Sequence, residues 1–463
     1  MSSLVTRMHA GRQEDDGALP QPQRTIAIIA ILSALALVVV DSAIANIALP
    51  SIGRALHVRP ALSVLVVTAY QLALVMTLLP CAALGESLGY RRVYTIGIAL
   101  FTAASVLCAL SPSLPWLVAA RFLQGLGGSA IMSLGIALMR RVVAPSRLGA
   151  AIGWNALTVA LASAAGPAIG AFILSVLSWP WLFAVNLPLG VMALAAGRAL
   201  PQTPGSARKL DVISMVLNAG IFGSFVTGLE FLPTHPAWAA GLLAAAGLGL
   251  TALIRREMPQ KAPLIPLDLL RIPSIRVSVI ASICCFTGQT AGLVALPFYL
   301  QHGLHQNALM TGLIIMPWPL TVALTAPVSG RLADRMPGAR LCVAGGVLLA
   351  AVLAAASAWP LHGNAIMLVP MIMLCGLGFG LFQVPNNRSM YLATPHERSG
   401  AAGGMQGTAR LSGQTMGAVL MTLLFTLASA SDAPRTGLMT GAMLALAAGL
   451  VSLLSARDPQ TRS

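Results

Sequence analysis

Long apolar runs separated by short polar connections fill this chain almost from end to end. A helix needs about 20 mostly apolar residues to cross the hydrocarbon core of a bilayer, and fourteen runs approach or exceed that length. They predict an all-α polytopic membrane protein with 14 transmembrane helices. The predicted spans are 25–49, 61–83, 93–110, 115–139, 149–174, 180–199, 211–231, 237–254, 275–301, 308–330, 340–358, 364–388, 401–428 and 436–455.

The composition agrees with this pattern. Of 463 residues, 57% are hydrophobic and 9% are charged, and the mean hydropathy is +0.83. A soluble domain of this length needs far fewer apolar residues, and no connection between the spans is long enough to hold one. We therefore expect the lipid bilayer to surround most of the chain.

The net charge of +15 would raise the question of nucleic-acid binding in a soluble protein. Here the basic residues are distributed unequally between the two faces of the membrane. An even number of spans puts both termini on one face, and that face receives most of the Lys and Arg residues. The loops of the other face hold only Arg54, Arg59 and Arg435, while Arg121 and Arg410 lie deep within spans. This positive-inside bias predicts cytoplasmic termini, and we expect no nucleic-acid partner.

Two polar stretches, 82–92 and 330–338, are similar to each other, and each follows the second helix of a candidate six-helix unit. Parallel repeats of this kind are a known transporter plan, with the substrate site between the repeats near the midplane. The predicted divisions are a cytoplasmic N-terminal tail (1–24), an N-terminal six-helix bundle (25–200), an inserted pair made of helices 7 and 8 (201–256), a cytoplasmic linker (257–274), a C-terminal six-helix bundle (275–455) and a cytoplasmic C-terminal tail (456–463).

The first span carries one acid, Asp41. A carboxylate at membrane depth is costly and therefore indicates a functional site. At 1.5 Å per residue, Asp41 lies about 24 Å above the cytoplasmic start of its span, and Arg121 lies about 9 Å below the outer end of the fourth span. The sequence thus predicts that the two charges lie at the same depth on neighbouring helices.

Such a pair has two interpretations. Desolvation favours the protonated form of Asp41, whereas a nearby Arg121 favours the carboxylate, so a conformational change that alters their distance would load and unload a proton. We expect that distance to change as the two six-helix bundles rock. The alternative is a static buried ion pair, although such pairs are often no more stable than apolar replacements.

Other polar residues at membrane depth are candidates for a substrate cavity, because polar side chains avoid lipid. Each could instead bond a neighbouring helix. The candidates are Asn46, Tyr70, Gln71, Gln124, Asn155, Gln289, Gln383 and Arg410. Gln124 shares a helix face with Arg121, three residues away.

The fifth span combines small residues with a proline. Gly166 and Gly170 have the spacing that lets helices approach closely, Gly153 lies between three and four turns earlier, and Pro167 bends the helix by removing a backbone hydrogen bond. This pattern suits a surface on which two halves slide or rock. Tight static packing is the alternative.

These motifs resemble the major facilitator superfamily, and the helix count resembles its drug:proton antiporter branch. Residues 41–50 are similar to that branch's first-helix motif, and 121–128 to its fourth-helix motif, whose Arg is implicated in proton transfer. Gly153, Gly166, Pro167 and Gly170 resemble its fifth-helix exporter motif. Asn186 belongs to a segment similar to the start of the sixth helix. The resemblance implies two six-helix bundles of the major facilitator fold.

The same resemblance implies a conformational latch in the two repeated loops. Glu86 stands where the family has Asp, Ser87 replaces the family's Arg, and Gly89 and Arg91 fit the motif. The later copy retains Asp334 and Arg335. In the family, this loop joins the two halves through its acid.

The sequence therefore predicts a multidrug-type antiporter of the bacterial inner membrane, which exports small amphipathic or cationic compounds against re-entering protons. A metabolite exporter or proton symporter of the same fold is the first alternative. A membrane-embedded sensor or enzyme is the second, but no zinc, nucleophile-elbow or P-loop motif is present. We expect a monomer that is not an enzyme, holds no metal or cofactor and draws its energy from the proton gradient.

Overall fold

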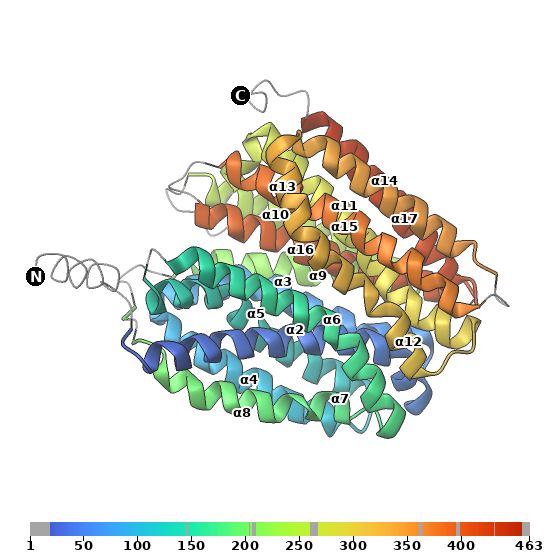
Figure 1. Cartoon of the computed structure of the whole chain (residues 1–463), viewed down its shortest axis with the longest axis horizontal. Coiled ribbons are helices and arrows are strands. Elements are labelled where there is room, and N and C mark those ends of the chain that lie inside the picture. Colours follow the sequence, from blue (N-terminus) through green and yellow to red (C-terminus); the bar gives the residue numbers. More distant parts are fainter. Residues whose placement is uncertain are drawn as a thin grey trace, which may run out of the picture.

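Figure 1 shows the computed structural model of the chain, in which helices run in two tilted groups. The structure describes residues 19–144, 147–202, 204–205, 210–259, 267–360, 364–394, 399–429 and 431–455. Every predicted span is occupied by helical structure, and the described residues contain no strand. Most of both predicted tails and the middle of the predicted linker, residues 260–266, lie outside the described residues.

The N-terminal half is built from α2 to α8, followed by the pair α9 and α10. Their bounds are α2 (Gln23–Ala55), α3 (Pro60–Leu88), α4 (Tyr90–Ala109), α5 (Leu114–Val142), α6 (Leu148–Val176), α7 (Trp181–Ala184), α8 (Asn186–Ala196), the 3-10 helix η2 (Gly197–Ala199), α9 (Val212–Phe231) and α10 (Pro236–Glu257). The predicted sixth span is thus divided among α7, α8 and η2.

The C-terminal half begins after the linker. Its elements are η3 (Leu267–Arg271), α11 (Pro273–Phe298), the π-helical turn η4 (Tyr299–Gly303), α12 (Ala308–Ile315), α13 (Pro317–Arg335), α14 (Gly338–Ser357), η5 (Ala365–Met367), α15 (Leu368–Leu392), α16 (Ser399–Leu427) and α17 (Ala433–Ser455). The predicted tenth span is therefore interrupted between α12 and α13, just before Pro317.

Local sequence explains several helix ends. Pro60, Pro236 and Pro273 stand in the first turn of their helices, where the missing N–H costs nothing and the fixed φ suits the helix. Gly89 separates α3 from α4 with a φ of 97°, a conformation that glycine adopts without strain. The Asp211 side chain accepts a hydrogen bond from the backbone N–H of Ser214 and so begins α9.

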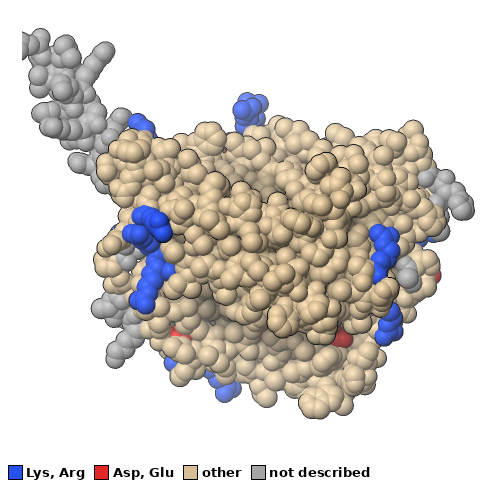
Figure 2. Space-filling model, turned by 90° about the horizontal axis from the view of Figure 1, so that it is seen from below, with Lys and Arg blue, Asp and Glu red and all other residues tan. Residues whose placement is uncertain are grey.

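Thirteen described helical segments are long and apolar enough to cross a membrane. The remaining predicted span, 401–428, forms α16, a helix of 29 residues. Gln406, Arg410 and Gln414 lower its mean hydropathy. On the face shown in Figure 2, uncharged side chains cover the broad centre, and the Arg side chains lie around the edges, as expected for a protein embedded in lipid.

The chain begins α2 and ends α17 at the same end of the molecule (Figure 1). We call this end the terminal face and the other end the opposite face. Toward the opposite face, a single buried core joins the two halves, including Ile47 of α2, Leu296 of α11 and Ile315 of α12. A second core lies within the N-terminal half and includes only Leu411 from the C-terminal half. The halves are therefore joined by this core toward the opposite face, and nearer the terminal face α16 packs on α3, where Gly404 and Gly407 lie close to Leu79 and Leu78.

Helix α6 carries exposed apolar residues along its whole length. Trp154 and Leu161, in its terminal half, are 59% and 58% exposed, and Phe172 and Val176, near the opposite face, are 62% and 61% exposed, whereas Ala171 is fully buried. In the facing helix α13, Leu324 and Val328 are 66% and 58% exposed. Near the terminal face, α6 and α13 thus present uncovered apolar surfaces.

His57 and His305 mark a structural repeat. Each has a φ of 53°, and they are the two described non-glycine residues with positive φ. His57 lies in the turn after α2, and His305 lies in the turn after η4, at the end of the first long helix of the C-terminal half. The two halves therefore make the same left-handed turn at equivalent places.

Candidate functional site

Asp41 of α2 and Arg121 of α5 form an ion pair in the interior of the N-terminal half. Arg121 Nη1 lies 2.6 Å from Asp41 Oδ2, and each side chain is 1% exposed. A buried charge is tolerated when it is paired and hydrogen-bonded. The structure thus brings together the two charges that the sequence places at equal depth.

Two neutral amides complete the surroundings of the carboxylate. Gln124 Nε2 donates to Asp41 Oδ1 at 2.9 Å, and Asn186 Nδ2 donates to the same oxygen at 2.6 Å. Both carboxylate oxygens thus accept hydrogen bonds, as a carboxylate can. Helices α2, α5 and α8 therefore converge on one acidic side chain.

Arg121 is held from several sides. Its Nε donates to the backbone oxygen of Val66 at 3.2 Å, and its Nη1 also donates to Gln124 Oε1 at 2.6 Å. The guanidinium carbon lies 4.2 Å from the centre of the Tyr70 ring and 5.5 Å from that of Phe183. These cation–π contacts stabilise the guanidinium in addition to the ion pair, in a site that is buried from solvent.

Two polar residues of α4 extend the network. Gln124 Nε2 donates to Ser105 Oγ at 2.8 Å, and Cys108 Sγ lies 3.7 Å from Gln124 Oε1. Sequence reasoning did not include Ser105 or Asn186 among the site residues. A small hydroxyl in an apolar helix gives little signal, whereas Asn186 was marked by the motif-like segment in which it lies.

Several predicted cavity residues have buried polar atoms without a hydrogen-bond partner. These atoms are Asn46 Oδ1, Tyr70 Oη, Gln71 Oε1 and Arg410 Nε. Gln124 and Tyr70 contact the ion pair, as described above. Asn155, Gln289 and Gln383 are half-buried, and no side-chain hydrogen bond joins them to Asp41 or Arg121. A common cavity formed by these residues stays a prediction.

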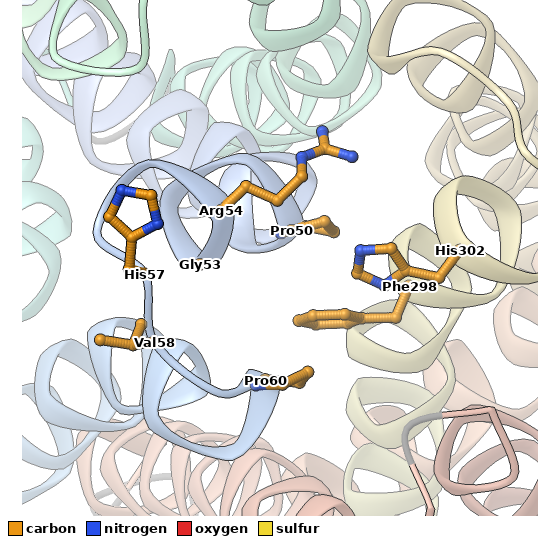
Figure 3. A pocket seen from close by; sticks show the side chains of 8 residues that line it. All are labelled: Pro50, Gly53, Arg54, His57, Val58, Pro60, Phe298 and His302. Atoms are coloured by element: carbon orange, nitrogen blue, oxygen red, sulfur yellow. The ribbon is translucent and has the colours of Figure 1, made fainter.

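The opposite face is closed by contacts between the two halves. Arg54 Nη2 donates to Gln301 Oε1 at 3.2 Å, and Gln301 Nε2 lies 3.5 Å from the backbone oxygen of Ile47. A cavity of about 450 Å³ lies beside these contacts. Figure 3 shows Arg54 and His57 on one side of it and Phe298 and His302 on the other.

Helix α6 is packed closely on two sides. A Cβ at Gly166 would meet Ala43 of α2, and a Cβ at Gly312 of α12 would lie 2.5 Å from the backbone oxygen of Pro167. A Cβ at Gly170 would lie 3.3 Å from Ile44, which is a tight contact, whereas Gly153 has open space around it. The glycines near the opposite face therefore serve close packing in this conformation, and Gly153 does not.

The two latch loops have different partners. Asp334 Oδ1 forms an ion pair of 2.8 Å with Arg388 Nη2, between α13 and α15 of the same half. Arg91 Nη2 donates to the backbone oxygen of Arg198 at 3.2 Å. Arg388 was not among the predicted residues. A latch between the halves, with Glu86, Gly89 and Arg335, stays a prediction.

Known proteins are similar to this chain along most of its length. The family model described as Major Facilitator Superfamily matches residues 31–418 and 278–462. "Uncharacterized transporter YebQ" of Escherichia coli (strain K12) is 43% identical over 451 residues, which cover 96% of this chain and 98% of that protein. "Tetracenomycin C resistance and export protein" of Streptomyces glaucescens is 30% identical, covering 86% of this chain and 75% of that protein.

The fold has solved counterparts as well. A crystal structure of a POT family transporter in complex with thioalcohol conjugated peptide aligns with a TM-score of 0.73. The alignment covers 97% of this chain and 99% of that chain at 13% sequence identity. At this identity the likeness concerns the fold alone, and it agrees with the all-α polytopic architecture.

Proposed function

The chain belongs to the Major Facilitator Superfamily, and we propose that within this family of transporters it is a proton-coupled exporter of small amphipathic or cationic compounds. The observation that carries the proposal is Asp41, a buried carboxylate in a membrane-spanning helix, bound by one guanidinium and two amides. Stability alone is a poor reason for such a pair. A site that takes up and releases a proton accounts for it.

We assign the terminal face to the cytoplasm, because it carries most of the basic residues. The protein is then a multi-pass protein of the bacterial inner membrane with both termini inside. With the opposite face closed through Arg54 and Gln301, the described conformation corresponds to the inward-facing state of an alternating-access cycle. In this state, three side chains donate hydrogen bonds to Asp41.

The location of the pair changes the expected mechanism. Asp41 and Arg121 both belong to the N-terminal half, so a rigid rotation of one half against the other leaves their distance unchanged. The expectation that their distance changes as the two bundles rock stays a prediction, and it requires more than a rigid rotation of the halves. Proton uptake instead requires α2 to shift against α5 within the half, which would lengthen the bond of 2.6 Å between Asp41 and Arg121.

The cycle then has two steps at this site. When the outer side opens, α2 moves, Arg121 no longer compensates Asp41, and the carboxyl takes a proton while substrate leaves. When the inner side opens, Arg121 and the amides of Gln124 and Asn186 favour the carboxylate again, and the proton is released to the cytoplasm. The proton gradient supplies the energy, and no cofactor is needed.

We favour export as the direction of transport and small amphipathic or cationic compounds as the substrates. The relative named for tetracenomycin C resistance and export supports outward transport of an organic compound. A metabolite exporter or a proton symporter of the same fold would differ in substrate or in direction. Inside-out membrane vesicles separate the exporters from the symporter, because a proton-coupled exporter accumulates its substrate there only when the vesicle interior is acidic, and the substrates found separate a drug exporter from a metabolite exporter.

The experiment compares wild type with Asp41→Asn, which keeps the size of the side chain and removes its charge. Substrates are first found with a drug-sensitivity panel in a host lacking its own pumps, and flux is then measured in vesicles with and without a protonophore. We expect wild-type uptake to collapse with the protonophore and Asp41→Asn to show no gradient-driven uptake. Asp432→Asn, which removes an exposed acid, is the matched control. Gradient-driven uptake by Asp41→Asn at the wild-type rate would reject the proposal.

A further inference from the structure

The pair formed by α9 and α10 is attached to the N-terminal half near the terminal face. Asn218 Nδ2 of α9 donates to the backbone oxygen of Met76 in α3 at 2.8 Å, and Gly223 leaves room for the Met76 side chain. Further toward the opposite face, α9 ends at Phe231, beside the first turns of α3 and α5. Between these helices lies a lateral cavity.

This lateral cavity has a volume of about 620 Å³. Its walls are apolar side chains of α3 and α5, among them Leu65, Leu72, Phe122 and Leu123. Thr68 also lines it, but its hydroxyl is bonded to the backbone oxygen of Val64. The remaining lining residue is Glu230 of α9, which is the one charged group among the residues that line the cavity.

The carboxylate of Glu230 has no compensating group among the described residues. Its Oε1 is buried and has no hydrogen-bond partner, and no Lys or Arg lines the cavity. A buried carboxylate oxygen without a partner is costly, and a positive charge beside it would remove most of that cost. The apolar walls would at the same time accept a hydrophobic body of drug-like size.

We infer that this lateral cavity is a binding site for a lipophilic monovalent cation, with the positive charge at Glu230 and the apolar body between α3 and α5. A phospholipid with an amino headgroup fits less well, because its phosphate would find no Lys or Arg among the lining residues. Binding here requires neither proton coupling nor a given direction of transport, so the inference goes beyond the proposed function.

The cavity is also distinct from the ion pair. Arg121 turns inward and donates to the backbone oxygen of Val66, while the next residue, Phe122, lines the cavity. The two sites therefore lie on either side of the same stretch of α3 and α5. Removing the charge of Asp41 should leave the lateral cavity unchanged.

Binding of tetraphenylphosphonium to the full-length protein in lipid nanodiscs tests the inference. We expect Glu230→Gln to weaken binding by about tenfold or more, the size of one interaction with a charged partner. Ala69→Leu, which fills the cavity from α3, should weaken it as well. Asp432→Asn, which removes an exposed acid outside the cavity, should bind as wild type does, and triphenylphosphine oxide, which is neutral, should show no dependence on Glu230.

Each alternative gives a different result. Wild-type affinity in both Glu230→Gln and Ala69→Leu would overturn the inference. Loss of binding in Asp41→Asn but not in Glu230→Gln would place the cation in another site and would overturn it too. Nanodiscs with and without phosphatidylethanolamine should give the same affinity. A tenfold loss when this lipid is present would identify the lipid as the occupant instead. A melting temperature of Glu230→Gln equal to that of wild type shows that the variant is folded when its affinity is measured.

Discussion

Asn186 donates a hydrogen bond of 2.6 Å to Asp41 Oδ1, although 145 residues separate the two along the chain. The bond joins α8 to α2 in the interior of the N-terminal half, where both side chains are almost fully buried. Together with Gln124, Asn186 gives the carboxylate two neutral donors in addition to Arg121. The stability of the half and the chemistry of the acid thus depend on the same contacts.

The first prediction concerns this bond. Asn186→Leu removes a donor to a buried carboxylate, and we expect the free energy of unfolding to fall by about 1–3 kcal/mol. Thermal or chemical unfolding in detergent measures the change. Asn155→Leu, at a half-buried position in the terminal half of α6, is the control and should change stability little. An Asn186→Leu variant as stable as wild type would contradict the importance of the bond.

The second prediction separates the effect of the two buried charges on stability from their effect on transport. Arg121→Gln leaves Asp41 as a buried charge without its cation, and we expect a loss of about 3–5 kcal/mol in unfolding free energy. The double variant Asp41→Asn, Arg121→Gln removes both charges and should recover much of that loss. Its gradient-driven transport should nevertheless stay absent. Unfolding and vesicle flux are measured on the same preparations. If the single and the double variant are equally stable, the ion pair with Asp41 is not the contact through which Arg121 stabilises the protein.

The third prediction concerns the close approach of α12 to α6. Gly312→Val would place a branched side chain against Ala171 and the backbone of Pro167, at a cost of about 1–3 kcal/mol to the packed arrangement. We expect the population to shift toward conformations in which the opposite face opens. Distances between spin labels at His57 and His305, in a background without the six native cysteines, report this shift.

The matched control for this substitution is Gly153→Ala in α6. Nothing lies within 4 Å of a Cβ built at Gly153, so the label distances should equal those of wild type. If Gly312→Val leaves the distribution unchanged, close packing at this position does not hold the opposite face shut.

The fourth prediction concerns the ion pair between Asp334 and Arg388. Its side chains are 64% and 42% exposed, and pairs of this exposure contribute about 0–1 kcal/mol. Asp334→Asn should therefore change the unfolding temperature far less than Arg121→Gln does. If the loop acts as a latch, transport should slow in Asp334→Asn although stability is kept. Unchanged transport together with unchanged stability would leave the pair without a role in the cycle.

Much of the fold was predictable because a bilayer imposes length and apolarity on each helix. The predicted spans coincide with helical segments, including α16, whose polar residues lower its hydropathy. The break between α12 and α13 was not predicted, since the run 308–330 is apolar throughout and Pro317 alone does not reveal where a helix will be interrupted. The turn at His57 was also hidden, because left-handed backbone in a non-glycine residue has little sequence signal.

The site was partly predictable, for a similar reason. Charges within spans are rare, so Asp41 and Arg121 stood out, and helix rise placed them at equal depth. Ser105 and Arg388 could not be found in this way, because depth along a helix does not say which face it turns toward a neighbour. Glu230 was not among the predicted site residues, and only the packing of α9 against α3 reveals the cavity that it lines.

The close contacts of α6 have a mechanical consequence. Gly166 touches α2 at Ala43, and its neighbour Pro167 touches α12 of the other half. Ala43 is two residues from Asp41. A displacement of α12 therefore pushes on this turn of α6, and α6 in turn pushes on the backbone of α2 beside Asp41. The carboxylate can respond to movement between the halves without any change in the interior of the C-terminal half.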